Sequence, residues 1–202
     1  DQTAFGGDKV TTESYDPKGA KKVLEDAGWV DTDGDGIREK DGKKLVVKWL
    51  TYPTRQELPL LAEAAQASLK EIGIEVDINN TLDVNEVVQD ASAWDVYAMA
   101  NVQAPTGDPE YWFRVFALSD SAKNQGKYSN AQLDALDEQL SQEFDTAKRA
   151  DLAVQMQQIL LDDNAFVFCS FLKMSMISRS NVSNYTSHAC DYYQITADLD
   201  IE

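Results

Sequence analysis

The order strand, helix, strand, helix, strand in the first half of the chain most constrains its fold. Residues 45–51 and 73–78 read as strands, and the largely apolar residues 94–102 indicate a strand buried on both faces. Apolar residues recur at helical spacing between these strands, over residues 54–73 and 83–91. This order predicts an α/β fold, with a mixed but mostly parallel sheet flanked by helices.

A helix with a defined beginning and end precedes the first of these strands. Asp16 is a good N-cap and Pro17 suits the first helical position. Apolar residues then recur at helical spacing until Gly28, which is a natural helix stop. For the helix over residues 54–73, Thr54 and Glu57 are expected to form a capping box.

The loop that follows the first helix resembles part of a calcium site. Asp31, Asp33 and Asp35 match the first, third and fifth positions of an EF-hand loop. The twelfth position, where a bidentate glutamate should close such a site, is Gly42, and residues 44–50 predict a strand in place of a second helix. We therefore interpret the segment as a turn of Asp and Gly residues. The alternative is a weak calcium site on the three aspartates, in a calcium-binding structural module.

The second half of the chain is mostly helical in pattern. Helices are expected over residues 109–117, 129–144 and 146–162, the second of them capped by a serine at its start. Apolar strands are expected over residues 165–172 and 174–178.

Charge and composition exclude several classes of partner. The 202 residues carry a formal net charge of −17, which excludes nucleic acid as a partner and disfavours an anionic membrane surface. No apolar run is long enough to span a membrane, and the chain does not open with a signal peptide. Cys169 is expected to be a small core residue, and its pairing with Cys190 is left open.

Signatures of an enzyme are scarce. The chain has one histidine, His188, and it lacks a Gly-x-Ser-x-Gly elbow, a phosphate loop and a dinucleotide fingerprint. The acidic residues are spread over helix faces and do not form a catalytic pair. We predict that the chain is not an enzyme and has no cofactor. His188 is expected to be a solvated loop residue, with ligand contact or metal coordination as the alternative.

The candidate ligand-binding loop is residues 101–109, between the apolar strand and an aromatic helix. In an open α/β sheet, ligands bind beyond the carboxyl ends of the strands, and helix N-termini favour anionic groups. The candidate contacts are Asn101, Val102, Gln103, Ala104, Pro105, Thr106, Trp112 and Arg114. The alternative for Trp112 is inward packing. Structural roles are expected for Asp108, Phe113 and Phe116.

Several short motifs in combination resemble a known family. They are Tyr-Asp-Pro at 15–17, Ala-Gly-Trp at 27–29, Ile-Gly-Ile-Glu-Val at 72–76, Gly-Asp-Pro at 107–109 and Tyr-Ser-Asn at 128–130. Together they resemble the C-terminal lobe of the family 5 extracellular solute-binding proteins, which are receptors of peptide and nickel ABC importers. The resemblance covers nearly the whole chain. It implies one lobe of a type II periplasmic-binding-protein fold, in which a ligand is enclosed between two lobes.

The resemblance also implies an organisation for the complete receptor. Residues 15–183 would form the ligand-binding lobe, and residues 1–14 and 184–202 would be crossover segments toward the missing N-terminal lobe. The expected partner is an ABC importer permease. The expected location is extracytoplasmic, either periplasmic or as a cell-surface lipoprotein.

Two features of the resemblance bear on the ligand. Similar peptide-binding members carry an aspartate where this chain has Pro105, so the charge that would hold a peptide ammonium is absent. Ala104 and Pro105 ahead of Asp108 are closer to the nickel-binding branch. Nickel suits imidazole, and His188 is the one imidazole available, but a small chelating ligand would supply further ligands itself. The resemblance therefore favours a nickel chelate, with an oligopeptide or dipeptide as the alternative.

Overall fold

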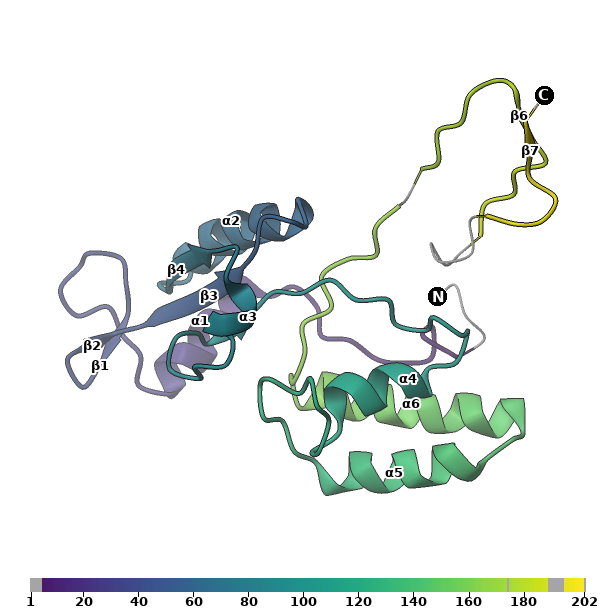
Figure 1. The fold of residues 1–202 in the computed structure, drawn as a ribbon. Helices are drawn as coiled ribbons and strands as arrows, with labels where there is room; N and C mark the ends of the chain where they lie inside the picture. Colours follow the sequence, from purple (N-terminus) through teal and green to yellow (C-terminus); the bar gives the residue numbers. More distant parts are fainter. Residues whose placement is uncertain (1–4, 174, 189–194, 202) are drawn as a thin grey trace. The chain divides into compact units, whose positions relative to one another are not determined.

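The computed structural model describes residues 5–173, 175–188 and 195–201 (Figure 1). The chain forms two compact units. We call Glu13–Asn101 the sheet unit, and Asp1–Thr12 with Val102–Glu202 the helical unit. In the described part of the chain, no helix has both the length and the apolar character to cross a bilayer.

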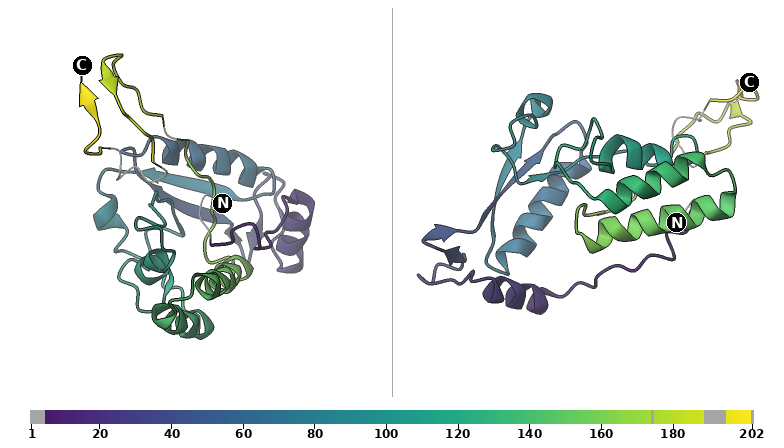
Figure 2. Two further views of the ribbon diagram at one scale, coloured as in Figure 1. Left: turned by 90° about the vertical axis from the view of Figure 1, so that its right-hand side faces the viewer. Right: turned by 90° about the horizontal axis from the view of Figure 1, so that it is seen from below.

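Three parallel strands form the centre of the sheet unit, in the order β4-β3-β5. Strand β3 (Val46–Thr51) pairs with β4 (Glu75–Asn80) along its full length. Helix α2 (Glu57–Lys70) connects these two strands and packs along both of them (Figures 1 and 2). The expected α/β fold with parallel strands is confirmed.

Strand β5 is shorter than the sequence indicates. Only Val96–Tyr97 is a strand, where residues 94–102 were expected, and both residues are partly exposed. The parallel pairing stops after the N–H of Ala98 donates to the carbonyl of Leu50 at 2.9 Å. β5 lies at an edge of the three-stranded sheet and pairs with β3, and the partial exposure of both its residues shows that the prediction of burial on both faces is wrong.

The caps of the first two helices differ in how well the sequence predicted them. Helix α1 (Pro17–Asp26) begins as expected, because the Asp16 carboxylate accepts the N–H groups of residues 18 and 19. The expected capping box of α2 is wrong: the helix begins at Glu57, and its N-cap residue makes no side-chain bond. Pro59 is tolerated there because it lies in the first turn, where its missing N–H has no helical partner.

The core of the sheet unit includes a cluster between the sheet and the short helix α3 (Val84–Val87). Leu50 is fully buried and packs with Val84 and Val88. Aromatic and aliphatic side chains that pack against this cluster are Tyr52, Val87, Trp94 and Tyr97. The cluster therefore lies beside the ends of β3 and β5.

The helical unit is built on α5 (Ala131–Gln142) and α6 (Thr146–Asp162), which run side by side (Figures 1 and 2). The short helix α4 (Glu110–Trp112) continues into the π-helix η1 (Phe113–Ala117). The largest buried residues of this core are Trp112, Phe113, Phe116, Leu133, Leu136, Leu140, Met156 and Leu160. Phe113 and Phe116 therefore have the structural role that the sequence predicted.

Helix α5 is capped by Asn130, which corrects the predicted serine cap at residue 129. The Asn130 side-chain oxygen accepts the N–H groups of residues 132 and 133, at 2.9 and 3.1 Å. Its amide nitrogen donates to Asp163 at 2.8 Å, and the Tyr128 hydroxyl donates to the same carboxylate at 2.6 Å. One side chain thus caps α5 and ties it to the end of α6.

The segment after α6 corrects two expectations. The described residues of 165–178 form no strand, although two strands were predicted there; residue 174 lies outside the described residues. Val167, Phe171 and Ile177 are highly exposed, and Cys169 is an exposed free thiol instead of a core residue. A strand needs a hydrogen-bonded neighbour, which an apolar pattern does not supply. Further on, β6 (Val182–Ser183) pairs with β7 (Asp200–Ile201).

The N-terminal segment of the helical unit is bonded to α6. The main chain of Thr11 exchanges two hydrogen bonds with the Gln158 side chain, at 2.8 and 3.1 Å. The Gln157 amide donates to the carbonyl of Phe5 at 3.2 Å. The first described residues are therefore fastened to α6.

Candidate functional site

The carboxyl edge of the sheet unit is a natural ligand-binding edge. All three strands are parallel, so the loops after β3, β4 and β5 leave from the same edge. The hydroxyl of Tyr52, directly after β3, accepts the N–H of Ala100 at 3.4 Å and so connects two of these loops. Asn101 follows, and its side chain is exposed. Sequence reasoning missed Tyr52, although its place directly after a strand was a signal.

The surroundings of this edge are largely apolar with a few polar groups. The rings of Trp94 and Tyr97 lie 5.9 Å apart. Burial raises the pKa of the Tyr97 hydroxyl, and Tyr52 adds to the effect. Thr51 is fully buried, and its hydroxyl has no hydrogen-bond partner in the described structure. Such a mixture of apolar surface and sparse polar groups is typical of small-molecule sites.

The predicted ligand-binding loop continues into the helical unit. Val102, Gln103, Ala104 and Pro105 are partly exposed, and Thr106 is exposed. The N–H of Gly107 donates to the carbonyl of Ala104 at 2.9 Å, and Gly107 has a φ of 80°. This tight turn holds the loop and explains the need for glycine at that position. Contact of these residues with a ligand stays a prediction.

Asp108, at the end of this loop, is held by Arg149, whose side chain is 14% exposed. The Arg149 Nη2 lies 2.8 and 2.7 Å from the two Asp108 oxygens, and 3.1 Å from Glu110. Arg149 Nη1 also donates to the carbonyls of Leu140 and Glu143, at 2.6 and 2.8 Å. Asp108 also accepts the N–H of Glu110, the first residue of α4, which agrees with the structural role expected for it; the N-cap position of α4 is Pro109.

Trp112 and Arg114, the other candidate contacts on this side, differ in exposure. Trp112 is 8% exposed, and four phenylalanine rings surround it, with centroids 5.1–5.9 Å away. Its ring is thus placed inward, as the alternative interpretation expected. The Arg114 side chain is 58% exposed and forms ion pairs with Glu110 at 3.1 Å and Asp137 at 3.7 Å. Of the two, Arg114 is the one open to a ligand.

Asp137 makes the stability of the helical unit depend on pH. Burial raises its pKa to about 6, although Arg114 opposes the shift. A carboxyl whose pKa is higher when folded stabilises the fold below its unfolded pKa, and this stabilisation is lost as pH rises to about 6. The free energy of unfolding of Asp137→Asn should therefore be compared with that of wild type at two pH values. Between pH 4 and neutral pH, the difference should shift in favour of the variant by on the order of 2 kcal/mol. Urea unfolding at both pH values measures this difference.

The exposed neighbour Glu138 provides the control for that experiment. Glu138→Gln removes the same charge from the same helix without a buried carboxyl. It should show the same stability difference from wild type at both pH values. An equal pH response in the two variants would contradict the assignment to Asp137.

His188 and the three loop aspartates, the predicted metal ligands, fall in different units. His188 is exposed in the helical unit, just before residues 189–194, which lie outside the described residues together with Cys190. A pocket of about 560 Å³ in the same unit is lined by Asn184, Thr186, Thr196 and Asp198. Metal coordination by His188 stays a prediction.

The aspartate loop of the sheet unit is a turn, as predicted. Asp31 accepts the N–H groups of Gly34 and Gly36, at 2.7 and 2.9 Å. Asp33 accepts the N–H of Asp35 at 3.1 Å, and Asp35 that of residue 37 at 2.9 Å. These bonds between carboxylates and nearby amides account for the Asp and Gly pattern.

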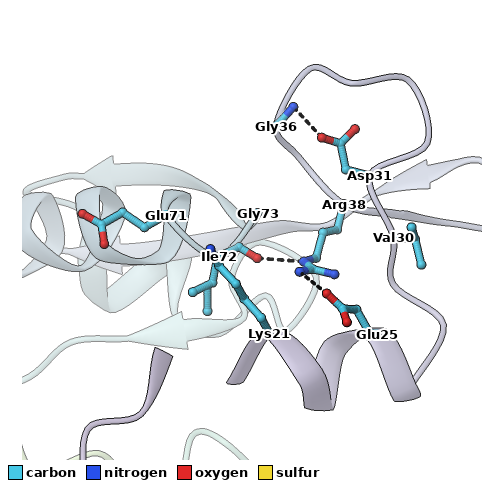
Figure 3. Close-up of a pocket in the computed structure, with 9 residues that line it drawn as sticks. All are labelled: Lys21, Glu25, Val30, Asp31, Gly36, Arg38, Glu71, Ile72 and Gly73. Atoms are coloured by element: carbon cyan, nitrogen blue, oxygen red, sulfur yellow. Dashed lines mark hydrogen bonds and ion pairs between the residues drawn. The ribbon is translucent and has the colours of Figure 1, made fainter. Parts of the chain in front are cut away.

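A second pocket, of about 300 Å³, lies next to this loop and contains the side chain of Arg38 (Figure 3). The guanidinium donates to the carbonyls of Ile72 and Trp29, at 2.8 and 2.9 Å, and to Glu25 at 3.1 Å. The main chain of Arg38 bonds to Gly73 and to residue 45, which precede β4 and β3. The pocket therefore lies at the amino ends of the strands, away from the ligand-binding edge. The Arg38 side chain that lines it anchors α1 to the sheet.

The family is decided by a match over most of the chain. The model of the bacterial extracellular solute-binding proteins, family 5 middle region, matches residues 2–124. The chain belongs to family 5 of these proteins. Two curated family 5 relatives are the nickel-binding protein NikA of Staphylococcus aureus, 29% identical over 174 residues, and the oligopeptide-binding protein AppA of Bacillus subtilis, 30% identical over 178 residues.

Solved structures agree with this assignment. AppA from Bacillus subtilis in complex with a nonapeptide superposes with a TM-score of 0.82 over 99% of this chain, at 25% identity. NikA from Staphylococcus aureus in complex with Ni(L-His)2 superposes with a TM-score of 0.73 over 96%, at 24% identity. The fold is therefore that of family 5, a type II periplasmic-binding-protein fold.

The match covers only part of each relative. The alignments include 84% and 86% of this chain but 34% and 32% of NikA and AppA. This chain thus spans about a third of the length of the curated family 5 proteins that it matches. Their names include both a nickel-binding and an oligopeptide-binding protein, so membership in family 5 leaves the ligand open.

Proposed function

We propose that this chain is the substrate-binding lobe of an extracytoplasmic solute receptor that delivers nickel, as a small chelate, to an ABC importer. The receptor binds its cargo and changes no covalent bond in it. Its ligand would contact the loop of residues 101–106, which follows β5. The remainder of the site would come from the missing N-terminal lobe.

One observation carries the choice of nickel over peptide. A peptide ammonium in a site closed to water needs a carboxylate partner. Residues 101–107 contain no acidic residue, and the next residue, Asp108, already has both oxygens bound to Arg149. This loop therefore offers a peptide N-terminus no available charge. Arg114, which is exposed, would suit the carboxylate of a chelating ligand.

The scarcity of histidine is compatible with a chelated metal. Nickel prefers imidazole among protein ligands, and the chain supplies only His188. A nickel ion that arrives with its own nitrogen and oxygen ligands needs few from the protein. The solved NikA complex with Ni(L-His)2 is an example of such a cargo in a related protein.

An oligopeptide or dipeptide is the second candidate. The observation that favours it is the likeness to AppA, which is 30% identical and superposes with the TM-score of 0.82. In that case a carboxylate from the missing lobe would hold the peptide ammonium.

Isothermal titration of the full-length receptor distinguishes the two ligands. We expect saturable heat with nickel plus L-histidine or with nickel citrate, and none with a pool of short peptides. Magnesium citrate serves as the control for binding of the organic ligand alone. Peptide binding without a response to nickel would overturn the proposal in favour of the second candidate.

The role of His188 has its own test in the same receptor. If the imidazole coordinates the metal, His188→Ala should weaken nickel affinity by roughly tenfold, the scale expected from loss of one hydrogen-bonded or ligating contact. Ser187→Ala is a matched control on the adjacent exposed residue. Unchanged nickel affinity in His188→Ala would remove this residue from the site.

The wider organisation belongs to the same proposal. Residues 15–183 would form the lobe, with 1–14 and 184–202 as crossovers toward the N-terminal lobe. The location would be periplasmic or, with a lipid anchor, at the cell surface. The short length relative to NikA and AppA supports a missing lobe, because two thirds of each relative has no counterpart here.

A further inference from the structure

Four carboxylates of the sheet unit converge at one point. We call residues 31–39 the acidic loop. One oxygen from each of Asp31, Asp33, Asp35 and Glu39 lies within 4.8 Å of the other three. Two oxygens on opposite sides of a calcium ion, each at the usual 2.3–2.6 Å, are about 5 Å apart. The four oxygens can therefore belong to a single coordination shell.

Glu39 provides an observation that is independent of the aspartates. Its carboxylate is buried, and Oε2 accepts the N–H and the hydroxyl of Thr32, at 2.8 and 3.0 Å. The other oxygen, Oε1, is buried and has no hydrogen-bond partner among the described residues. A buried carboxylate oxygen without a partner is costly, and a cation in the loop would satisfy it.

The backbone fixes Glu39 in this position. Its N–H donates to the carbonyl of Val30 at 2.9 Å, and the N–H of Val30 donates back at 3.1 Å. This antiparallel bridge closes the acidic loop. It brings Glu39, the ninth residue counted from Asp31, next to the three aspartates. The place of the missing twelfth-position ligand is thus taken by Glu39.

Lys44 is the competing cation. Its ammonium lies 3.7 Å from Asp33 and forms a closer ion pair with Asp35. Hydrogen bonding to Lys44 lowers the pKa of Asp35, and the same bond raises the pKa of Lys44. One ammonium balances only part of the charge of four carboxylates. The loop would therefore still attract a divalent cation electrostatically even if Lys44 stayed nearby.

We propose that the acidic loop binds one divalent cation, calcium in preference to magnesium, through Asp31, Asp33, Asp35 and Glu39. Calcium takes six to eight oxygen ligands in a wide and adaptable shell, and water and backbone carbonyls would complete it. Magnesium requires a tighter octahedron, about 4 Å across, and retains most of its water. The spacing of the four oxygens fits the larger ion better.

The site would have a structural role. Arg38, next to Glu39, bonds to Glu25 of α1 and to the carbonyl of Ile72 ahead of β4 (Figure 3). A cation in the loop would therefore also hold α1 against the amino ends of the strands. Because solutes are expected at the opposite, carboxyl edge, this inference does not depend on which solute the receptor carries.

Calcium titration of the full-length receptor, stripped with chelator, tests the site. We expect calcium chloride to produce saturable heat and to raise Tm, because binding to the folded state alone stabilises it. Magnesium chloride should do so more weakly. Glu39→Gln and Asp33→Asn should each weaken calcium affinity by about tenfold or more, since the charge of the ligands sets affinity. Lys44→Gln should strengthen it.

Asp41→Asn is the matched control, because it removes one charge from an exposed residue just beyond the acidic loop. Asp41 has a φ of 53°, which asparagine also adopts readily. Its calcium affinity should equal that of wild type. No heat and no change in Tm up to roughly 10 mM calcium, weaker than most extracellular calcium modules, would overturn the proposal. An equal loss in Asp41→Asn and Glu39→Gln would overturn it too, by showing only a general charge effect.

Discussion

Replacing Arg149 with methionine is expected to destabilise the helical unit by about 2–3 kcal/mol. The side chain is 14% exposed and joins Asp108 and Glu110 to two carbonyls near the end of α5. Its removal breaks the ion pairs with both carboxylates and the bonds to both carbonyls, while Glu110 keeps its ion pair with Arg114 and Asp108 keeps the N–H of Glu110. The estimate is below the usual cost of breaking a fully buried pair, because Asp108 is 36% exposed and water can reach it. Urea unfolding followed by circular dichroism measures the loss.

Lys148→Met is the control for Arg149→Met. Lys148 is the preceding residue of α6, is 70% exposed and lies 3.7 Å from Glu143 in a surface ion pair. Its loss should cost less than about 0.5 kcal/mol, as is usual for exposed pairs. Because the two variants change charge equally, similar losses would mean that net charge, and not the bonds of Arg149, determines stability.

Gly73→Ala is expected to destabilise the sheet unit by about 2–4 kcal/mol, through two separate effects. Gly73 has a φ of 89°, which costs an alanine about 1 kcal/mol. A Cβ there would also lie 2.7 Å from Cγ of Arg38. Arg38 is buried and held by three side-chain hydrogen bonds, so it cannot move aside without breaking them. Thermal and urea unfolding measure the change.

Gly42→Ala separates the two effects. Gly42 has a φ of 73°, but a Cβ added to it meets no atom within 4 Å. This variant should lose only the conformational term, about 1 kcal/mol. If Gly42→Ala and Gly73→Ala are destabilised equally, the clash with Arg38 contributes nothing.

Elements defined by local patterns were predictable from the sequence. The bounds of α6 (Thr146–Asp162) agree with the expected helix, because Asp145 caps it and apolar residues recur along its length. Helix α1 and the paired strands β3 and β4 follow the same logic. Their signals lie within a few residues of one another, where capping and periodicity operate.

Features that depend on distant partners were predicted less well. Residues 165–172 have an apolar pattern typical of a strand, yet no strand partner is present among the described residues. The cap of α5 was assigned to the wrong residue because Asn130 is selected in part by Asp163, more than thirty positions away. The sequence pattern of one segment does not show which distant segment will pair with it.

The candidate site shows the same division. The loop at 101–109 was found because it follows a strand, but the inward position of Trp112 depends on Phe166 and Phe168, which come much later in the chain. Glu39 was missed because a linear template places the closing glutamate at position twelve. A hairpin closed by Val30 brings it to the aspartates three positions earlier.

The attachment of Thr11 to Gln158 has a consequence for the order of synthesis. These residues are 147 positions apart, and the whole of the sheet unit lies between them. A ribosome releases the sheet unit as one continuous stretch, which can fold as soon as it has emerged. Residues 5–12 cannot make their bonds to α6 until α6 has been made. Chaperones that meet the nascent chain would therefore find these residues exposed for longer than the sheet unit that follows them.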